Sequence, residues 1–134
     1  MPEIKVAFKA IIKKDDKILV IKRSSNEEVY SELWDIPGGR MNFGETPAEA
    51  LKREAKEETG LDIELNRPFR IWTFMANPEK QVIGITCIAD YVSGEVILSA
   101  EHTEFRWIDA SEFQALAADK HLKEEISLYA KSRQ

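Results

Sequence analysis

Three glutamates at positions 54, 57 and 58 have a spacing that could hold a metal ion. Residues three and four positions apart lie on one side of a helix, so Glu54, Glu57 and Glu58 would share an arc of about 100°. Carboxylates this close repel one another and raise each other's pKa values unless a cation neutralises them. Two interpretations are open from the spacing alone: a site for Mg²⁺ or Mn²⁺, which prefer oxygen ligands, or a solvated patch of surface charge.

The helix that must position these glutamates has clear ends in the sequence. Thr46 is a suitable N-cap, Pro47 fits the first helical position, and Glu49 follows Thr46 at the spacing of a capping box. Gly60 supplies a left-handed stop. The arc expected to pack on a sheet comprises Ala48, Leu51 and Ala55. The opposite arc, expected to face water, comprises Glu49, Lys52, Arg53 and Lys56.

Strands are predicted on both sides of this helix. Residues 4–12 and 17–22 are β-branched and partly alternating, a pattern typical of a hairpin that turns around Lys14, Asp15 and Asp16. Residues 24–34 are polar and irregular, and Pro37-Gly38-Gly39 is expected to interrupt regular structure. Further strands are predicted near 62–75, 81–92 and 104–108, and helices at 110–118 and 120–132.

Composition sets the expected domain organisation and partners. The chain has 134 residues, of which 43% are apolar, which favours a single domain over residues 1–134. With a net charge of -5 and no run of Lys and Arg, a nucleic acid polymer is not an expected partner. No apolar run approaches the roughly 20 residues that cross a bilayer, and no cleavage pattern marks the N-terminus, so we expect no membrane partner and a cytoplasmic location. The single cysteine, Cys87, is expected to pack in a core.

The stretch from Gly39 to Leu61 resembles the signature of the Nudix family, G-x5-E-x7-R-E-U-x-E-E-x-G-U, where U is a bulky aliphatic residue. The matching positions are Gly39, Glu45, Arg53, Glu54, Glu57, Glu58, Gly60 and Leu61. The first U position holds Ala55, which is smaller than the pattern asks for. Two flanking features also resemble the family layout: Trp34-x-x-Pro37-Gly38-Gly39 before the signature, and Glu101-x5-Trp107 after it.

This resemblance implies an α/β fold, a Nudix-type α/β/α sandwich around a mixed β-sheet. It also implies a MutT-like nucleotide pyrophosphohydrolase, which hydrolyses the pyrophosphate bond of a nucleoside diphosphate linked to another group, with Mg²⁺ or Mn²⁺ as cofactor. The small chain favours a nucleoside triphosphate, although no spacing separates that substrate from ADP-ribose, a sugar nucleotide or a dinucleoside polyphosphate. The alternatives are a nucleotide-binding or sensing module with little turnover, and a protein-interaction domain with an acidic helix.

By its position in the signature, each site residue inherits an expected role. Glu54, Glu57, Glu58 and the backbone carbonyl of Gly38 are expected to bind the metal, and Glu101 is expected to add a further carboxylate. The general base is expected to be one of the signature glutamates, or else Glu101 or Glu104. The alternative for Glu101 and for Glu104 is a solvated loop residue. Arg53 is expected to orient a signature glutamate, with Glu45 behind the metal ligands; the alternative is a surface ion pair between Arg53 and Glu49.

Substrate contacts are expected from residues outside the signature. Arg23 and Arg70 could contact phosphate or ribose, and Trp34 could stack on a base, although a core position is the usual one for an aromatic residue. His102 is expected at the surface or in contact with substrate rather than as a metal ligand. Small proteins of the family are often dimers, so a homodimer is one expected partner state and a monomer the other.

Overall fold

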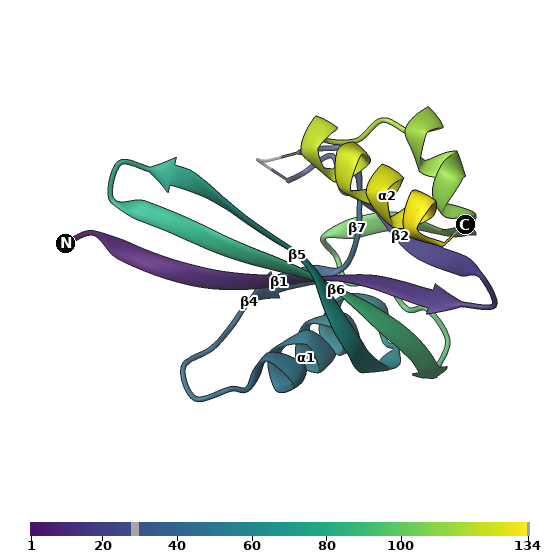
Figure 1. Cartoon of the computed structure of the whole chain (residues 1–134), viewed down its shortest axis with the longest axis horizontal. Coiled ribbons are helices and arrows are strands. Elements are labelled where there is room, and N and C mark those ends of the chain that lie inside the picture. Colours follow the sequence, from purple (N-terminus) through teal and green to yellow (C-terminus); the bar gives the residue numbers. More distant parts are fainter. Residues whose placement is uncertain (28–29, 134) are drawn as a thin grey trace.

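The computed structural model describes residues 1–27 and 30–133, in which one mixed β-sheet lies between two α-helices (Figure 1). The central strands β1 (Glu3–Lys14) and β6 (Lys80–Ser93) run parallel, and β5 (Asp62–Asn77) pairs antiparallel with β6. The shorter strands are β2 (Lys17–Arg23), β3 (Trp34–Asp35), β4 (Gly38–Arg40) and β7 (His102–Ile108). The five predicted strands are confirmed within a few residues of their ends. Positions 28 and 29 of the predicted loop 24–34 lie outside the described residues.

A tight turn joins β1 to β2 at the predicted position. Asp15 and Asp16 have left-handed backbone conformations, with φ values of 49° and 67°. Lys14 pairs with Lys17 across them. Two successive positive φ values are typical of a type I′ turn, whose twist matches that of the flanking strands, and aspartate tolerates this conformation better than most residues. The predicted hairpin is therefore confirmed.

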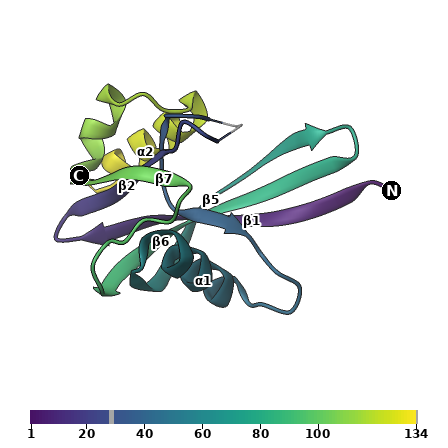
Figure 2. The same cartoon turned by 180° about the vertical axis from the view of Figure 1, so that it is seen from behind.

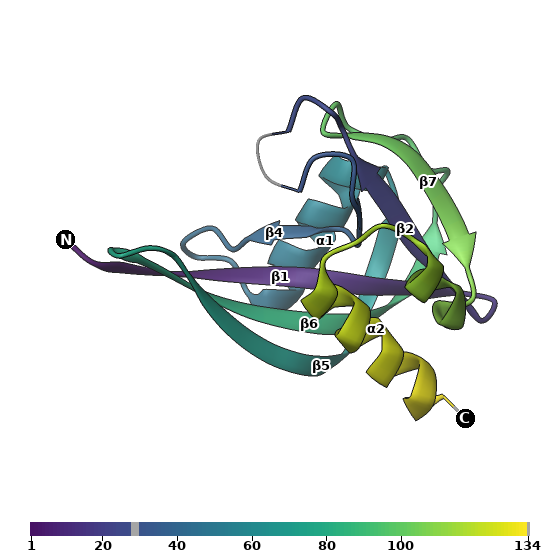
Figure 3. The ribbon, with the colours of Figure 1, turned by 90° about the horizontal axis from the view of Figure 1, so that it is seen from above.

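The glycine pair after Pro37 forms strand β4, so the expectation that it would interrupt regular structure is wrong. β4 pairs antiparallel with the middle of β1, with Gly39 opposite Phe8, and it lies beside β1 in Figure 3. One edge of β1 therefore changes partner along its length, from β4 at its middle to β2 at its end. Pairing with a long central strand overrides the weak strand propensity of glycine, which local sequence cannot reveal.

Two hydrophobic cores, one on each face of the sheet, explain the alternation of side chains along β1 and β2. The first core contains Phe8, Ala10, Ile12, Leu19 and Ile21, together with Leu51 of α1 (Pro47–Thr59). The second contains Ile11, Ile18 and Val20, together with Ile126 and Tyr129 of α2 (Lys120–Ser132). Seen from behind in Figure 2, α1 and α2 again cover opposite faces. The predicted α/β/α sandwich around a mixed sheet is confirmed.

The helices begin and end close to their predicted positions, with one exception. α1 has the capping box of Thr46 and Glu49, and Gly60 ends it with a φ of 76°. The predicted helix at 110–118 is instead a 3₁₀ helix, η1 (Ala110–Ala115). It ends early because the next residues become extended and the carbonyl of Ala117 accepts a hydrogen bond of 2.8 Å from the N–H of Trp34 in β3.

Beyond the two helices, the hairpin of β5 and β6 and the first half of β1 extend as an arm toward the N-terminus (Figure 3). Cys87 lies in the first core with 1% of its surface exposed, as predicted, and burial raises the pKa of its thiol. Within the described ranges, neither helix has the length and apolar character needed to cross a bilayer.

Candidate active site

Helix α1 turns its acidic side toward β4 because its apolar side chains fix its rotation. Leu51 and Ala55 are buried as predicted, but Ala50 is fully buried and Ala48 only half-buried. The buried arc is wider than predicted because α1 packs against β1, β4 and β5 together. Glu58 falls inside this wider arc, with 8% of its surface exposed.

The Arg53 side chain connects the acidic residues of the signature. Its Nε and Nη2 donate to the two carboxylate oxygens of Glu45, at 2.6 and 3.0 Å, and its Nη1 donates to Glu54 Oε1 at 2.8 Å. Nη2 also donates to the carbonyl of Arg40 at 2.9 Å, and Nη1 lies 3.4 Å from Glu57 Oε2. Hydrogen bonds to Glu45 and then to Glu54 raise the pKa of Arg53. One guanidinium therefore holds Glu45 and Glu54 in fixed orientations, and Glu57 is only loosely connected to it.

The position of Arg53 differs from the helical-wheel prediction, which placed it toward water. Its side chain is only 26% exposed, because it folds along the helix toward Glu45 in the preceding loop. Glu49 instead accepts a hydrogen bond of 2.8 Å from the N–H of Thr46, and among the described residues it forms no ion pair with Arg53. The hydrogen bond from Arg53 and a second from the N–H of Asn42 lower the pKa of Glu45.

Glu58 is a buried carboxyl group next to the β4 backbone. Its Oε1 accepts a hydrogen bond of 2.7 Å from the N–H of Gly38. Burial, the largest effect, raises the pKa of Glu58 to about 7, and the charges of Glu54 and Asp35 act in the same direction. The Gly38 N–H and the Lys9 ammonium oppose this shift without cancelling it. An additional cation at this point would favour the ionised carboxylate.

Gly38 presents its peptide groups to the helix rather than to β1. The N–H of Ala10 donates to the carbonyl of Pro37 at 2.8 Å, and in an antiparallel pair the hydrogen-bonded positions alternate. The next residue, Gly38, is therefore at a non-hydrogen-bonded position, where its N–H and its carbonyl both point away from β1. Because the N–H meets Glu58, the carbonyl oxygen is also directed toward the side of the sheet edge where Glu58 lies.

The absence of side chains at both glycines is what allows β4 to approach so closely. A Cβ added to Gly39 would lie 2.4 Å from the carboxylate carbon of Glu54. A Cβ added to Gly38 would lie 2.2 Å from the carbonyl oxygen of Phe8 in β1. The first clash involves a movable side chain and the second involves backbone, so the two glycines have different functions: one makes room for a signature carboxylate and the other allows the strand to pair.

A partly buried ion pair, which the sequence analysis missed, lies behind Glu58. The ammonium of Lys9 is 2.9 and 2.8 Å from the two carboxylate oxygens of Asp35 and 3.4 Å from the carbonyl of Ile36. The available signal was a single lysine between the buried residues Phe8 and Ala10 of a central strand, because an unpaired charge is rarely tolerated there.

His102 is buried, so the expectation that it would lie at the surface is wrong. Only 6% of its surface is exposed, and within the described part of the chain its Nδ1 has no hydrogen-bond partner. Burial is the main cause that lowers the pKa of His102 to about 4, and the charges of Asp35, Arg23 and Lys9 act on it. β7 carries His102 inward opposite Arg23 of β2, a placement that depends on strand pairing.

The two acidic residues near the start of β7 do not join the α1 glutamates in this arrangement. Glu101 is exposed, and its main-chain carbonyl accepts a hydrogen bond of 2.8 Å from Ser24. The chain just before it is anchored to α1, since Ser99 N–H donates to the carbonyl of Glu58 at 3.1 Å. Glu104 lies 3.4 Å from the Lys22 ammonium in an exposed ion pair on β7. The backbone therefore places Glu101 near the C-terminal end of α1, where Glu58 lies. The Glu101 carboxylate forms no hydrogen bond with the described residues of the signature.

A cavity of about 590 Å³ opens beside this cluster, on the α2 side of the sheet. All three predicted substrate residues, Arg23, Trp34 and Arg70, line it. Trp34 is 6% exposed and belongs mainly to the core, whereas Arg70 is half-buried on β5. Lys9 also lines the cavity, and its charge lowers the pKa of Glu58, so the cavity and the signature glutamates adjoin.

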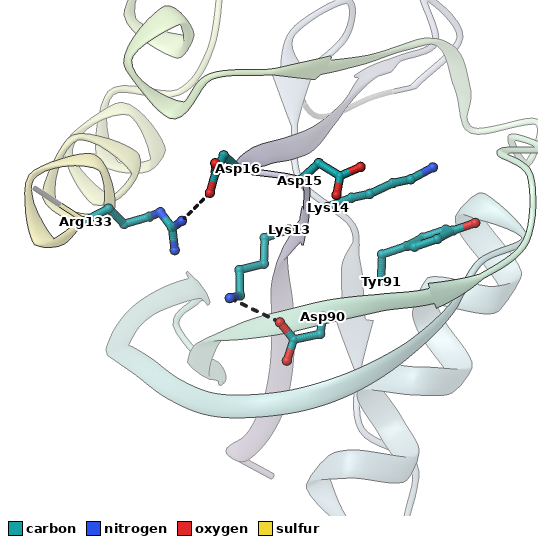
Figure 4. Close-up of a pocket in the computed structure, with 7 residues that line it drawn as sticks. All are labelled: Lys13, Lys14, Asp15, Asp16, Asp90, Tyr91 and Arg133. Atoms are coloured by element: carbon teal, nitrogen blue, oxygen red, sulfur yellow. Dashed lines mark hydrogen bonds and ion pairs between the residues drawn. The ribbon is translucent and has the colours of Figure 1, made fainter.

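A second cavity, of about 490 Å³, lies at the turn between β1 and β2 (Figure 4). Its charged groups already neutralise one another: Lys13 lies 3.3 Å from Asp90, and Arg133 lies 3.0 Å from Asp16. Lys14 rests over the ring of Tyr91, 4.3 Å from its centroid. None of the three predicted substrate residues lines this cavity, so we do not assign the site to it.

The donor atoms of the signature residues suit a divalent ion, but their side chains are spaced too widely to bind one as they stand. Within residues 1–27 and 30–133, no three His, Cys, Asp or Glu side chains are grouped closely enough to chelate one ion. The donors are nevertheless all oxygens, as Mg²⁺ requires, and among the described residues Glu58 forms no ion pair that would balance its charge. The Glu57 side chain is 59% exposed and free to change rotamer at low cost. Rotation of these side chains is what a metal would require.

Most of this chain is similar in sequence to known proteins. The family model for the NUDIX domain matches residues 3–130. An ADP-ribose pyrophosphatase of Methanocaldococcus jannaschii is 36% identical over 115 residues, which are 85% of this chain and 67% of that protein. A nucleoside triphosphatase, NudI, of an Enterobacter species is 30% identical over 116 residues, 79% of this chain and 82% of that protein.

Among solved structures, the crystal structure of the MutT protein from Methanosarcina mazei Go1 superposes with a TM-score of 0.85 at 26% identity. The superposition covers 99% of this chain and 97% of that one. The match to the family model spans both sheet and helices, and the signature helix lies where the resemblance in its sequence implies. The chain therefore belongs to the Nudix family and is a Nudix hydrolase.

Proposed function

We propose that this Nudix hydrolase cleaves the pyrophosphate bond of a nucleoside diphosphate derivative in a Mg²⁺-dependent reaction. The observation that carries the proposal is the arrangement around α1. Arg53 orients Glu54 and lies 3.4 Å from Glu57, and Glu58 meets the Gly38 backbone next to a cavity that contains cationic and aromatic side chains. A pyrophosphate carries dense negative charge, which an acidic protein can hold only with help from cations.

Glu54, Glu57, Glu58 and the carbonyl of Gly38 would hold the ion, with Glu101 added when its loop turns inward. Bound Mg²⁺, or Mn²⁺ in its place, would neutralise phosphate oxygens and stabilise the charge of the transition state. Arg53 acts as a positioning residue, because its guanidinium touches the carboxylates and not the cavity. Glu45 in turn fixes Arg53 through two hydrogen bonds.

The residues lining the cavity would bind the rest of the substrate. Arg23 and Arg70 are placed to contact phosphate or ribose oxygens, and the Lys9–Asp35 ion pair lies between the cavity and Glu58. Trp34 supplies part of an apolar wall. A carboxylate must also accept a proton from the attacking water, and we assign this role to a signature glutamate or to Glu101, with Glu104 less favoured because it faces solvent in an ion pair.

A nucleoside triphosphate is the substrate that we propose first, and ADP-ribose is its competitor. The similar proteins include one named a nucleoside triphosphatase and one named an ADP-ribose pyrophosphatase. These two proteins do not rank the substrates, because identity is higher to the pyrophosphatase, at 36% against 30%, and coverage is higher for the triphosphatase, at 82% against 67%. The triphosphate comes first on the small size of the chain. A cytoplasmic location and a single domain over residues 1–134 remain predictions from composition.

The test is product analysis by chromatography with nucleoside triphosphates, ADP-ribose, sugar nucleotides and dinucleoside polyphosphates, each assayed with Mg²⁺ and with EDTA. We expect a nucleoside triphosphate to give a nucleoside monophosphate and pyrophosphate, only with Mg²⁺. Release of AMP and ribose phosphate from ADP-ribose at a higher kcat/KM would transfer the assignment to that substrate. If Mg²⁺ stabilises the fold and no compound is cleaved, a nucleotide-binding or sensing module replaces the proposed enzyme.

A further inference from the structure

One wall of the large cavity carries a chain of hydrogen bonds that ends on a buried carboxyl group. The indole Nε1 of Trp72 donates to Thr86 Oγ1 at 3.0 Å, and Thr86 Oγ1 donates to Glu125 Oε1 at 2.7 Å. Thr86 is fully buried, and Glu125 has 7% of its surface exposed. The chain joins β5, β6 and α2 behind the cavity, and Trp72 and Glu125 both line it.

The direction of each hydrogen bond in this chain is fixed when Glu125 is ionised. An indole N–H is only a donor, so Trp72 uses an acceptor position of the Thr86 hydroxyl. An ionised carboxylate has no hydrogen to donate, so the single hydrogen of the Thr86 hydroxyl points to Glu125 Oε1, which accepts it. Among the described residues, its other oxygen, Oε2, accepts no hydrogen bond, which leaves that oxygen for a ligand in the cavity.

No ion-pair partner among the described residues explains why Glu125 is buried. Within the described part of the chain it forms no ion pair, and burial is the main cause that raises its pKa. The charges of Arg70 and Lys9 oppose that effect from a distance, but the Lys9 ammonium is already paired with Asp35. A buried carboxyl group with one oxygen unused lowers stability, which is typical of a group retained for ligand recognition.

The cavity wall beside Glu125 is flat and aromatic. The rings of Trp72 and Phe74 stack with centroids 5.9 Å apart and an interplanar angle of 15°. Trp72 lies against Gly84 of β6, where an added Cβ would be 2.1 Å from the ring. Its hydrogen bond to Thr86 also prevents the ring from turning. A planar ligand could stack here with one edge directed toward the carboxyl group of Glu125.

We propose that Glu125 determines base specificity by accepting a hydrogen bond from an exocyclic amino group, so that substrates with adenine, cytosine or guanine are preferred over matched bases with an oxo group. This inference rests on the proposed function, because it takes the cavity as the nucleoside site. An oxo group at the same position places two acceptors face to face, and a buried acceptor left without a donor weakens binding. The occupant is thus an amino-bearing nucleobase.

The first test measures the affinity of the protein with Mg²⁺ for nucleoside monophosphates, by calorimetry at about pH 8. In the pairs AMP and IMP, and CMP and UMP, an amino group is exchanged for an oxo group and the adjacent ring nitrogen changes from an acceptor to an N–H donor. We expect each amino compound to bind about ten-fold tighter than its oxo partner. The corresponding triphosphates, and ADP-ribose against its inosine analogue, should show the same order in kcat/KM.

The Glu125→Gln variant gives the sharper test, because the hydrogen bond from Thr86 favours one orientation of the new amide. Among the described residues the Thr86 hydroxyl donates only to the side chain of residue 125, so the amide oxygen takes this place and the NH₂ group points into the cavity as a donor. The preference should then reverse toward the oxo bases. Glu124→Gln is the matched control: it changes a neighbouring residue that also lines the cavity but is exposed on α2, and the original preference should persist.

The outcomes separate this inference from the proposed function. Cleavage of nucleotides with equal affinity for amino and oxo bases would overturn the role of Glu125 and leave the enzyme assignment intact. An amino preference that Glu125→Gln leaves unchanged would also overturn it. If no nucleotide is cleaved but AMP still binds tighter than IMP and the variant reverses the order, the proposed hydrolysis fails and the recognition by Glu125 stands.

Discussion

Replacing Glu58 by glutamine should make the metal-free protein more stable at alkaline pH. Burial raises the pKa of Glu58 from 4.5 to about 7. At 1.36 kcal/mol per pKa unit, ionising this carboxyl group costs the folded state about 3 kcal/mol relative to the unfolded chain. The amide of Glu58→Gln removes this cost, while its oxygen still accepts the hydrogen bond from the N–H of Gly38.

The stability advantage of Glu58→Gln appears at alkaline pH because the folded protein binds the Glu58 proton more tightly than the unfolded chain does. Because the pKa of Glu58 is higher in the folded protein, folding is favoured while the group is protonated. That contribution is complete below about pH 4.5, declines as the unfolded chain ionises, and is lost as the pH passes through about 7. His102 has the opposite shift, to about 4, so its contribution to stability grows between about pH 4 and 6.5. It titrates in both proteins and cancels in their difference.

The assay is urea unfolding of the wild type and Glu58→Gln in EDTA, at several values between about pH 4.5 and 8.5. We expect equal free energies of unfolding at the acidic end and an advantage of up to about 3 kcal/mol for the variant at the alkaline end. In thermal unfolding this corresponds to a rise in Tm of about 6–12 °C for a domain of this size. The EDTA keeps metal out of the comparison.

Glu57→Gln is the matched control, because it makes the same chemical change on a side chain that is 59% exposed. Its stability relative to the wild type should vary far less over the same pH range. If Glu58→Gln differs from the wild type by a constant amount at every pH, the burial of a carboxyl group is not what sets its pKa. A variant that is less stable at the alkaline end would refute the reasoning outright.

Three further predictions concern activity and metal. Glu57→Gln should lower kcat by orders of magnitude. Glu49→Gln should change kcat far less, because the new side chain can still complete the capping box. An equal loss of kcat in both variants in steady-state assays would contradict the assignment of Glu57 and Glu49 to different faces of α1. Gly39→Ala should displace the Glu54 carboxylate and reduce kcat with little change in Tm, and Gly38→Ala should instead lower Tm, since its Cβ meets backbone. Mg²⁺ should raise Tm more at about pH 8.5 than at about pH 6, because ligands bind metal when ionised; a pH-independent shift in thermal scans would argue against carboxylate ligation.

The elements that sequence predicted well are those determined by short-range signals. α1 is specified by a cap, a first-turn proline and a glycine stop, all of which act within a few residues, and its bounds were correct. The β1–β2 turn depends on two aspartates that adopt positive φ values themselves. The signature likewise lies in one continuous stretch, so the residues around Arg53 could be anticipated even though a helical wheel placed Arg53 toward water. A wheel records where a side chain starts and not how far a long one reaches.

What sequence missed depends on contacts between distant segments. β4 is a strand because β1 pairs with it, and His102 is buried because β7 pairs with β2. The Lys9–Asp35 pair joins residues 26 positions apart, and the Thr86–Glu125 hydrogen bond joins residues 39 positions apart. No local pattern encodes such partners. The one usable signal is a charged residue within an apolar element, which indicates that a partner exists without naming it.

The charge balance around Lys9 connects the two ends of the site. The Lys9 charge lowers the pKa of both Glu58 and Glu125, yet its ammonium already pairs with Asp35. Two buried carboxyl groups therefore share one cation that is already in use, and Arg70 acts on Glu125 only from a distance, so each group would be stabilised by a partner from a ligand. On the two proposals above, that partner would be a divalent ion carrying phosphate at Glu58 and an amino group of the base at Glu125. A single nucleotide with its metal supplies both, which is why one ligand should stabilise this cavity more than either fragment alone.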